Sequence, residues 1–173
     1  MLTQSLLQEL QEYLLEHQQI RMFDDSSSSK ESYESERVLQ NISPLEIEDF
    51  IKGNRKKSLR EVLFSFIDEK GLADSEIYKK ALIDRRHFSK IRSNLNYRPK
   101  KNTVIALALA LELNEDEIEE LLSSAGYSLS DSDTSDLIVR YFIEHHIYDI
   151  HQINEALEYF SAKPLSGRVS QAD

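Results

Sequence analysis

The sequence predicts an all-α fold, and three observations support this. The 173 residues include only 4 Gly and 3 Pro, so tight turns are few, whereas the helix formers Leu, Glu, Lys and Ala are plentiful. Several segments open with a capping residue followed three positions later by Glu, which is the pattern of a helix N-terminus. No segment shows the alternation of apolar and polar residues expected of a long strand.

The first expected helix covers residues 3–20 and is amphipathic. The leucines of its apolar face are Leu6, Leu7, Leu10 and Leu14. A helix of about eighteen residues is marginal alone, so this face must find a partner surface. It could form a homodimer or bind a partner protein, or it could pack on its own domain. We favour the first alternative, with residues 1–23 as an association helix.

Residues 24–41 are acidic and Ser-rich, with too few apolar side chains to bury, and are predicted to be a linker. Beyond them, Ser43 with Glu46 and Ser58 with Glu61 form capping boxes, and Asp74 is expected to cap a short helix. Helices are expected over roughly 44–53, 58–71, 74–80, 85–92, 103–112, 114–126, 133–146 and 150–160.

The expected helix 103–112 is apolar on nearly every side, so it should be the buried centre of the domain. Residues 42–163 are predicted to form this helical domain with its C-terminal extension, and residues 164–173 a flexible tail. The chain contains no Cys and no apolar run near the roughly 18–20 residues that span a bilayer. Its N-terminus lacks the features of a signal peptide. These observations predict a soluble, cytoplasmic protein without membrane contact.

Charge is strongly segregated along the chain. Residues 52–101 contain 15 Lys or Arg and 6 Asp or Glu, a net charge of +9, while the remaining residues have a net charge of −19. A basic segment between acidic flanks is typical of a small nucleic-acid-binding module. The acidic remainder would repel DNA elsewhere and confine contact to the basic face.

Within this basic segment, the expected helices 74–80 and 85–92 have only a short connection, which favours a large crossing angle, as in a helix-turn-helix. Phe88 and Ile91 share one face of the second helix. At about 100° per residue, the opposite face carries long cations and hydroxyls. Such a face suits the major groove, where Arg and Lys bind guanine.

Three stretches carry a family resemblance: IYKKALIDRRHFSKI at 77–91, PKKNTVIALALALEL at 99–113 and EIEELLSSAG at 117–126. Over residues 58–128 the chain resembles the lambda-repressor-like (xenobiotic-response-element) helix-turn-helix family. The resemblance implies a compact five-helix domain, here with an N-terminal amphipathic helix on a linker and two extra C-terminal helices. It also implies a regulator of transcription that binds double-stranded DNA, commonly as a homodimer.

Where the family usually has Ala and Gly, this chain has Tyr78 and Leu82, which add bulk where the two helices meet. On matching positions, the resemblance assigns contacts with DNA bases to Arg85, Arg86, Ser89 and Lys90. Contacts with phosphates are expected from Lys79, Lys80, Arg92, Asn94, Tyr97, Arg98, Lys100 and Lys101, and from Arg55, Lys56 and Lys57 before the domain.

Other interpretations remain. The cations could form a solvated surface, or the protein could be an antitoxin-like or adaptor subunit whose acidic arm, residues 1–51, binds a partner protein. RNA binding is weaker, because one Tyr97 is a poor stacking platform. Adjacent His145 and His146 point about 100° apart, unlike metal ligands on a helix. No pattern in the sequence indicates an enzyme, a cofactor or a metal site.

Overall fold

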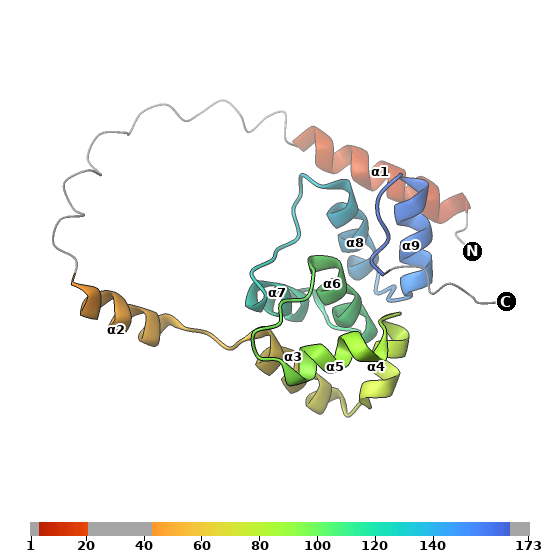
Figure 1. Ribbon diagram of the computed structural model, residues 1–173. Coiled ribbons are helices and arrows are strands. Elements are labelled where there is room, and N and C mark those ends of the chain that lie inside the picture. The colour runs from red at the N-terminus through yellow and green to blue at the C-terminus, as the bar shows by residue number, and fades with distance from the viewer. Residues whose placement is uncertain (1–3, 21–42, 167–173) are drawn as a thin grey trace, which may run out of the picture.

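The computed structural model describes residues 4–20 and 43–166, and every regular element in these residues is an α-helix (Figure 1), which confirms the all-α prediction. The helices are α1 (Gln4–Ile20), α2 (Pro44–Asn54), α3 (Leu59–Lys70), α4 (Asp74–Lys80), α5 (Arg85–Ser93), α6 (Lys101–Ala110), α7 (Glu115–Ser124), α8 (Thr134–Glu144) and α9 (Ile150–Tyr159). The predicted linker at 24–41 lies outside the described residues, as does the end of the tail, residues 167–173.

Local capping explains where most of these helices begin. Both capping boxes predicted from the sequence form, at Ser43 for α2 and at Ser58 for α3. The Ser58 N–H donates to Glu61 Oε2 at 2.7 Å, and hydrogen bonds from Ser58 hold the pKa of Glu61 below its usual value. For α4 the predicted cap is wrong: Asp74 is the first helical residue, and Ala73 is the N-cap, with its N–H bound to Glu76.

The centre of the core is α6, as predicted. All of residues 104–110 are buried, because this helix packs against α4, α7 and α9. Figure 1 shows α6 in the middle of the assembly, with α3, α4 and α5 below it and α8 and α9 above. The apolar residues of α8 and α9 belong to the same core cluster, so the two C-terminal helices extend the core.

The N-terminal helix α1 packs on α8 of its own chain. Leu10 is 0 % exposed and Leu14 is 6 % exposed, and Leu6 packs against the core at their edge. The Tyr13 hydroxyl donates to Glu144 at 3.0 Å, and the Tyr141 hydroxyl donates to Glu9 at 3.2 Å. The helix therefore packs on its own domain, which is the alternative to self-association or partner binding. Leu10 and Leu14 are buried within the protomer and are not available to a partner.

The C-terminal segment is ordered further than predicted. Instead of fraying at Pro164, the chain buries Leu165, and the Leu165 N–H donates to Asn154 Oδ1 at 2.8 Å. The Asn102 amide donates to the carbonyl of Pro164 at 3.4 Å, which ties the segment to the start of α6. Residues 164–166 are therefore part of the folded domain.

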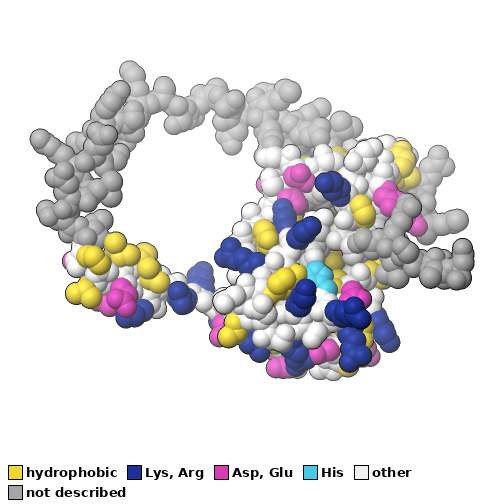
Figure 2. All heavy atoms as spheres, viewed as in Figure 1, with side chains coloured by type: hydrophobic (Ala, Val, Ile, Leu, Met, Phe, Trp, Pro, Cys, Tyr) yellow, Lys and Arg dark blue, Asp and Glu magenta, His cyan; other side chains and the backbone are white. Residues whose placement is uncertain are grey.

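Helix α2 stands apart from the other helices in Figure 1, although the sequence predicts that it belongs to the helical domain of residues 42–163. It buries no residue against any part of the described chain. Its apolar side chains, visible as a yellow row in Figure 2, include Leu45 at 71 % exposure and Phe50 at 68 %. No helix among the described residues has both the length and the apolar character that crossing a membrane requires.

Candidate nucleic-acid interface

The turn between α4 and α5 positions the candidate interface. Leu82 has a φ of 52°, in the left-handed region. Its N–H donates to the Lys79 carbonyl at 3.1 Å, and the next N–H, that of Ile83, donates to the Tyr78 carbonyl at 2.9 Å. This Schellman arrangement ends α4. A glycine would adopt this φ without strain, whereas here a leucine adopts it.

Asp84 then starts α5, since its carboxylate accepts the Arg86 N–H at 2.7 Å. The buried side of α5 consists of Phe88 and Ile91. The Phe88 ring lies 6.0 Å from Tyr78 of α4 and 6.2 Å from Phe64 of α3, measured between ring centroids. The bulk of Tyr78 is thus accommodated as an aromatic contact between the two helices.

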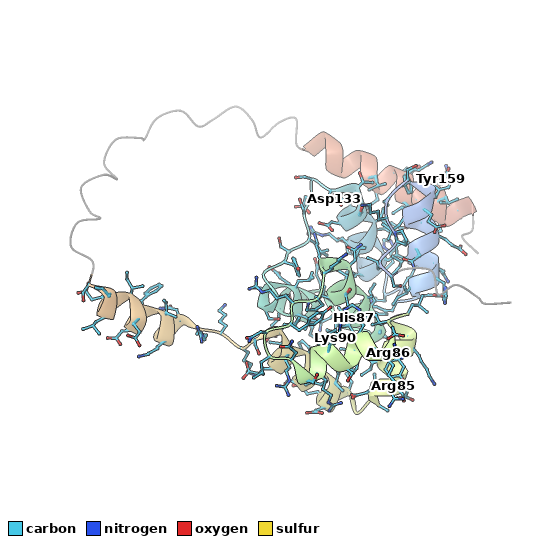
Figure 3. The ribbon with its side chains drawn as sticks, in the orientation of Figure 1. Arg85, Arg86, His87, Lys90, Asp133 and Tyr159 are labelled. Carbon is cyan, nitrogen blue, oxygen red and sulfur yellow. The ribbon has the colours of Figure 1, made fainter. Side chains whose placement is uncertain are left out.

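The opposite side of α5 carries three of the four predicted base contacts, the fourth, Arg85, lies on the flank, and all four side chains are exposed. Arg86, Ser89 and Lys90 share one face through i, i+3 and i, i+4 spacing, with Arg85 in the first turn. Figure 3 shows Arg85, Arg86 and Lys90 along this one helix. Within the described part of the chain, no carboxylate lies within ion-pair distance of these three cations. Their positive charge therefore faces solvent.

The loop after α5 is held by local bonds. The Tyr97 hydroxyl and His87 Nε2 lie 2.8 Å apart, with the two rings edge to face at 5.7 Å. Asn94 ends α5, and its side chain accepts the Asn96 N–H at 3.0 Å. Tyr97 is half-buried, so it braces the loop, whereas Asn94 and Arg98 are exposed beside α5.

Three of the predicted phosphate contacts are held in ion pairs. Arg92 binds Asp74 and lies over the Phe64 ring at 4.8 Å. Lys80 binds Glu112 at 3.1 Å. Lys101 binds the buried Asp136 at 2.5 Å, so its ammonium is directed into the domain. By contrast, Lys79 and Lys100 are exposed and make no ion pair with a described residue.

The three cations before the domain lie at a different place. Arg55, Lys56 and Lys57 connect α2 to α3 and line a groove together with acidic residues of α7, among them Asp116 and Glu119. These three cations therefore share a groove with carboxylates of α7. They do not line the groove at the α4–α5 turn.

Figure 2 shows Lys and Arg side chains gathered around His87, the cyan residue, on the face formed by α5 and the start of α6. One cation at this face is not among the contacts predicted from the sequence. Lys163 lines the same groove as Arg85 and Lys100. It follows α9, far from them in sequence, and no local pattern marks it. Only the anchoring of residues 164–166 on the domain brings it there.

The histidines near the end of α8 make structural contacts. The His145 ring stacks on Tyr141 at 4.0 Å, and its Nδ1 lies 2.7 Å from the Tyr141 carbonyl. Among the side chains that the structure describes, no three His, Asp or Glu converge in a way that could hold a metal ion.

Comparison of the chain with protein-family models, curated proteins and solved structures finds no match.

Proposed function

We propose that the protein is a sequence-specific DNA-binding regulator of transcription with a lambda-repressor-like helix-turn-helix, in which α5 enters the major groove. The observation that carries this proposal is that α5 has exposed cations on the side that faces away from the core. Arg85, Arg86 and Lys90 are exposed and without carboxylate partners in the described chain, on a helix whose other side is anchored by Phe88 and Ile91. A rigid helix with free cations is what groove recognition requires.

The neighbouring residues supply the positioning contacts in this proposal. Lys79, Asn94, Arg98 and Lys100 are exposed around α5 and would bind phosphates, which sets the register of the helix without reading sequence. Lys80 and Arg92 could join them, because exposed ion pairs are worth only about 0–1 kcal/mol and exchange partners at little cost. As a homodimer, the protein would present two copies of α5 to two half-sites.

The test is DNA binding measured by fluorescence anisotropy at low salt, on a site selected from random duplexes. Replacing both Arg86 and Lys90 by Ala should weaken binding to the selected site by about 10-fold or more per lost base contact. The matched control replaces Lys52 and Lys70 by Ala, which removes the same charge at exposed positions of α2 and α3. No binding by the wild type, or equal binding by the double variant, would refute the proposal.

The salt dependence of the same binding reaction gives a second measure. If about six phosphates are contacted, the logarithm of the association constant should fall with a slope of about −5 against the logarithm of salt concentration. A slope near zero would show that the cations do not meet phosphates.

A second candidate function is that of an adaptor or antitoxin-like subunit, and the exposed apolar side of α2 favours it. Of six large apolar side chains that are exposed among the described residues, four belong to α2: Leu45, Ile47, Phe50 and Ile51. The arm of residues 1–51 contains 11 Asp or Glu against 3 Lys or Arg. The matching partner is a protein with an apolar groove rimmed by Lys and Arg, which would accept α2 as a helix-in-groove ligand.

Point variants in α2 test this candidate better than deletion of residues 1–40, because deletion would also remove α1 from α8 and expose the core. Changing Phe50 and Ile51 to Ser should abolish co-purification of the partner while leaving the fold intact, since α2 buries no residue. Leu95→Ser, at another exposed apolar position, is the control. Undiminished recovery of the partner with the α2 variant would exclude this function.

A further inference from the structure

An open groove of about 1100 Å³ runs between the α4–α5 turn, the start of α6 and the C-terminal segment 163–166. Its cationic lining comes from all three elements: Lys79 and Arg85 from around the turn, Lys100 and Lys101 from the N-cap and first residue of α6, and Lys163 from the C-terminal segment. Half-buried Tyr78, Leu82 and Ile83 line it as well. The groove thus combines positive charge with apolar surface.

The C-terminal wall of this groove is firmly held. Leu165 is buried, its N–H is bound to Asn154 of α9, and the Pro164 carbonyl accepts from Asn102 of α6. The side chain of Lys163 is exposed at the point where this anchored segment leaves α9. The backbone that carries Lys163 is therefore held at the groove, so that a contact from its side chain costs less chain entropy.

The charges in the groove are unbalanced. Among the described residues that line the groove, Asp84 is the single carboxylate, and it already accepts the Arg86 N–H as the cap of α5. Lys101 is neutralised by Asp136, but no described carboxylate lies within ion-pair distance of Lys79, Arg85, Lys100 or Lys163. In addition, Lys100 supplies no side-chain acceptor to the first turn of α6, whose N–H groups favour an anion.

A sugar–phosphate strand matches this combination, because its phosphates are anionic and its deoxyribose rings have apolar edges. Arg85, in the first turn of α5, lines this groove and lies on the flank of α5, next to the side that carries Arg86 and Lys90. A strand that leaves the major groove beside α5 would therefore continue into the groove.

We propose that this groove holds the DNA backbone and that Lys163, from the C-terminal extension, is a phosphate-binding residue. The inference rests on the DNA-binding function proposed above. It gives the C-terminal helices a part in recognition: they carry a cation to the DNA in addition to completing the core.

The experiment compares wild type, Lys163→Ala and the control Lys52→Ala, which removes one charge from α2. Lys163→Ala should weaken binding about 3- to 10-fold on selected and random duplexes alike and reduce the salt slope by about 1, because a phosphate contact carries no sequence information. Ethylation interference should lose one phosphate position per half-site. Thermal unfolding of this variant should match that of the wild type, since the side chain is exposed.

The outcomes distinguish failure of the groove assignment from failure of the proposed DNA-binding function. DNA binding by the wild type with unchanged affinity, salt slope and ethylation pattern in Lys163→Ala overturns the groove and leaves the function standing. No DNA binding by the wild type overturns both. Inorganic pyrophosphate is the probe for a small phosphorylated ligand: if it binds in a Lys163-dependent way while DNA binding does not depend on Lys163, the groove is a small-anion site and the backbone assignment is wrong.

Discussion

At the scale of single residues, four helices end on a non-glycine residue in the left-handed region. Leu82, Glu112, His146 and Ser161 have φ values of 52–58°. After each one, the N–H of the next residue donates to the carbonyl five positions earlier, at 2.8–3.2 Å, and those next residues are Ile83, Leu113, Ile147 and Ala162. The helix α7 ends in the same way, at Gly126. The apolar residue after the left-handed position therefore indicates the C-terminus of a helix better than glycine does.

This geometry predicts that Ser161→Gly stabilises the protein. The left-handed conformation costs an L-residue about 1–2 kcal/mol, and glycine avoids this cost. Part of the stabilisation is lost, because glycine has more conformational freedom in the unfolded chain. We expect the free energy of unfolding to rise by about 0.5 kcal/mol, measured with denaturant. Ser123→Gly, at an exposed position with helical backbone in α7, is the control and should lower it by a similar amount. Destabilisation by Ser161→Gly would show that φ strain is not the dominant effect.

At the scale of elements, α1 is attached to α8 by a reciprocal pair of tyrosine–glutamate bonds. Tyr13 of α1 donates to Glu144 of α8, and Tyr141 of α8 donates to Glu9 of α1. The two rings meet edge to face at 5.1 Å. Burial and then the bond to Glu144 raise the pKa of Tyr13, while burial and then the bond to Glu9 raise the pKa of Tyr141 to about 12.

These pKa shifts predict that the docking of α1 weakens at high pH. Both phenols are favoured in their protonated form in the folded state, so their contribution to stability is complete below the ordinary tyrosine pKa of 10.0 and is lost as pH rises towards about 12. The free energy of unfolding should therefore fall between pH 10 and pH 12.

Denaturant unfolding at pH 9 and pH 11.5 measures this fall. In a variant with Phe at both positions 13 and 141, the decline should be smaller, because the groups that must lose protons are gone. An equal decline in that variant would locate the pH dependence elsewhere in the molecule.

At the scale of the whole molecule, the five helices α3–α7 and the C-terminal helices are joined by a buried polar contact as well as by apolar packing. The side chain of Asp136 on α8 is 8 % exposed and accepts from Lys101 Nζ at 2.5 Å and from the Ser130 N–H at 2.7 Å. Because Lys101 begins α6, this contact fixes the start of the central helix against α8. The two parts are thus expected to unfold together.

Asp136→Ala should lower the free energy of unfolding by about 3 kcal/mol, since it leaves Lys101 partly buried without its partner. The unfolding curve should keep a single transition, with the midpoint shifted to lower denaturant concentration. The control is Asp131→Ala, which removes the ion pair between Asp131 and Arg140. Because the Asp131 side chain is 57 % exposed, this change should lower the free energy of unfolding by about 1 kcal/mol or less. Equal costs for the two variants would contradict the role given to Asp136.

The sequence by itself determined the elements and the charge of α5. Caps such as Ser43, Ser58 and Asn114 act through hydrogen bonds within three residues, so helix starts follow from local sequence. The separation of Arg86 and Lys90 from Phe88 and Ile91 follows from the helical repeat alone.

Only the tertiary structure decided which surfaces are free. The ion pairs of Arg92, Lys80 and Lys101 join residues 18, 32 and 35 positions apart, and no local pattern encodes them. The same holds for the docking of α1, where Leu10 and Leu14 meet α8, and for the position of Lys163 at the groove that Arg85 also lines. An apolar pattern specifies that a helix face must be buried, but it does not specify which surface buries it. The reason is that the hydrophobic effect is non-directional and depends only on the apolar area removed from water.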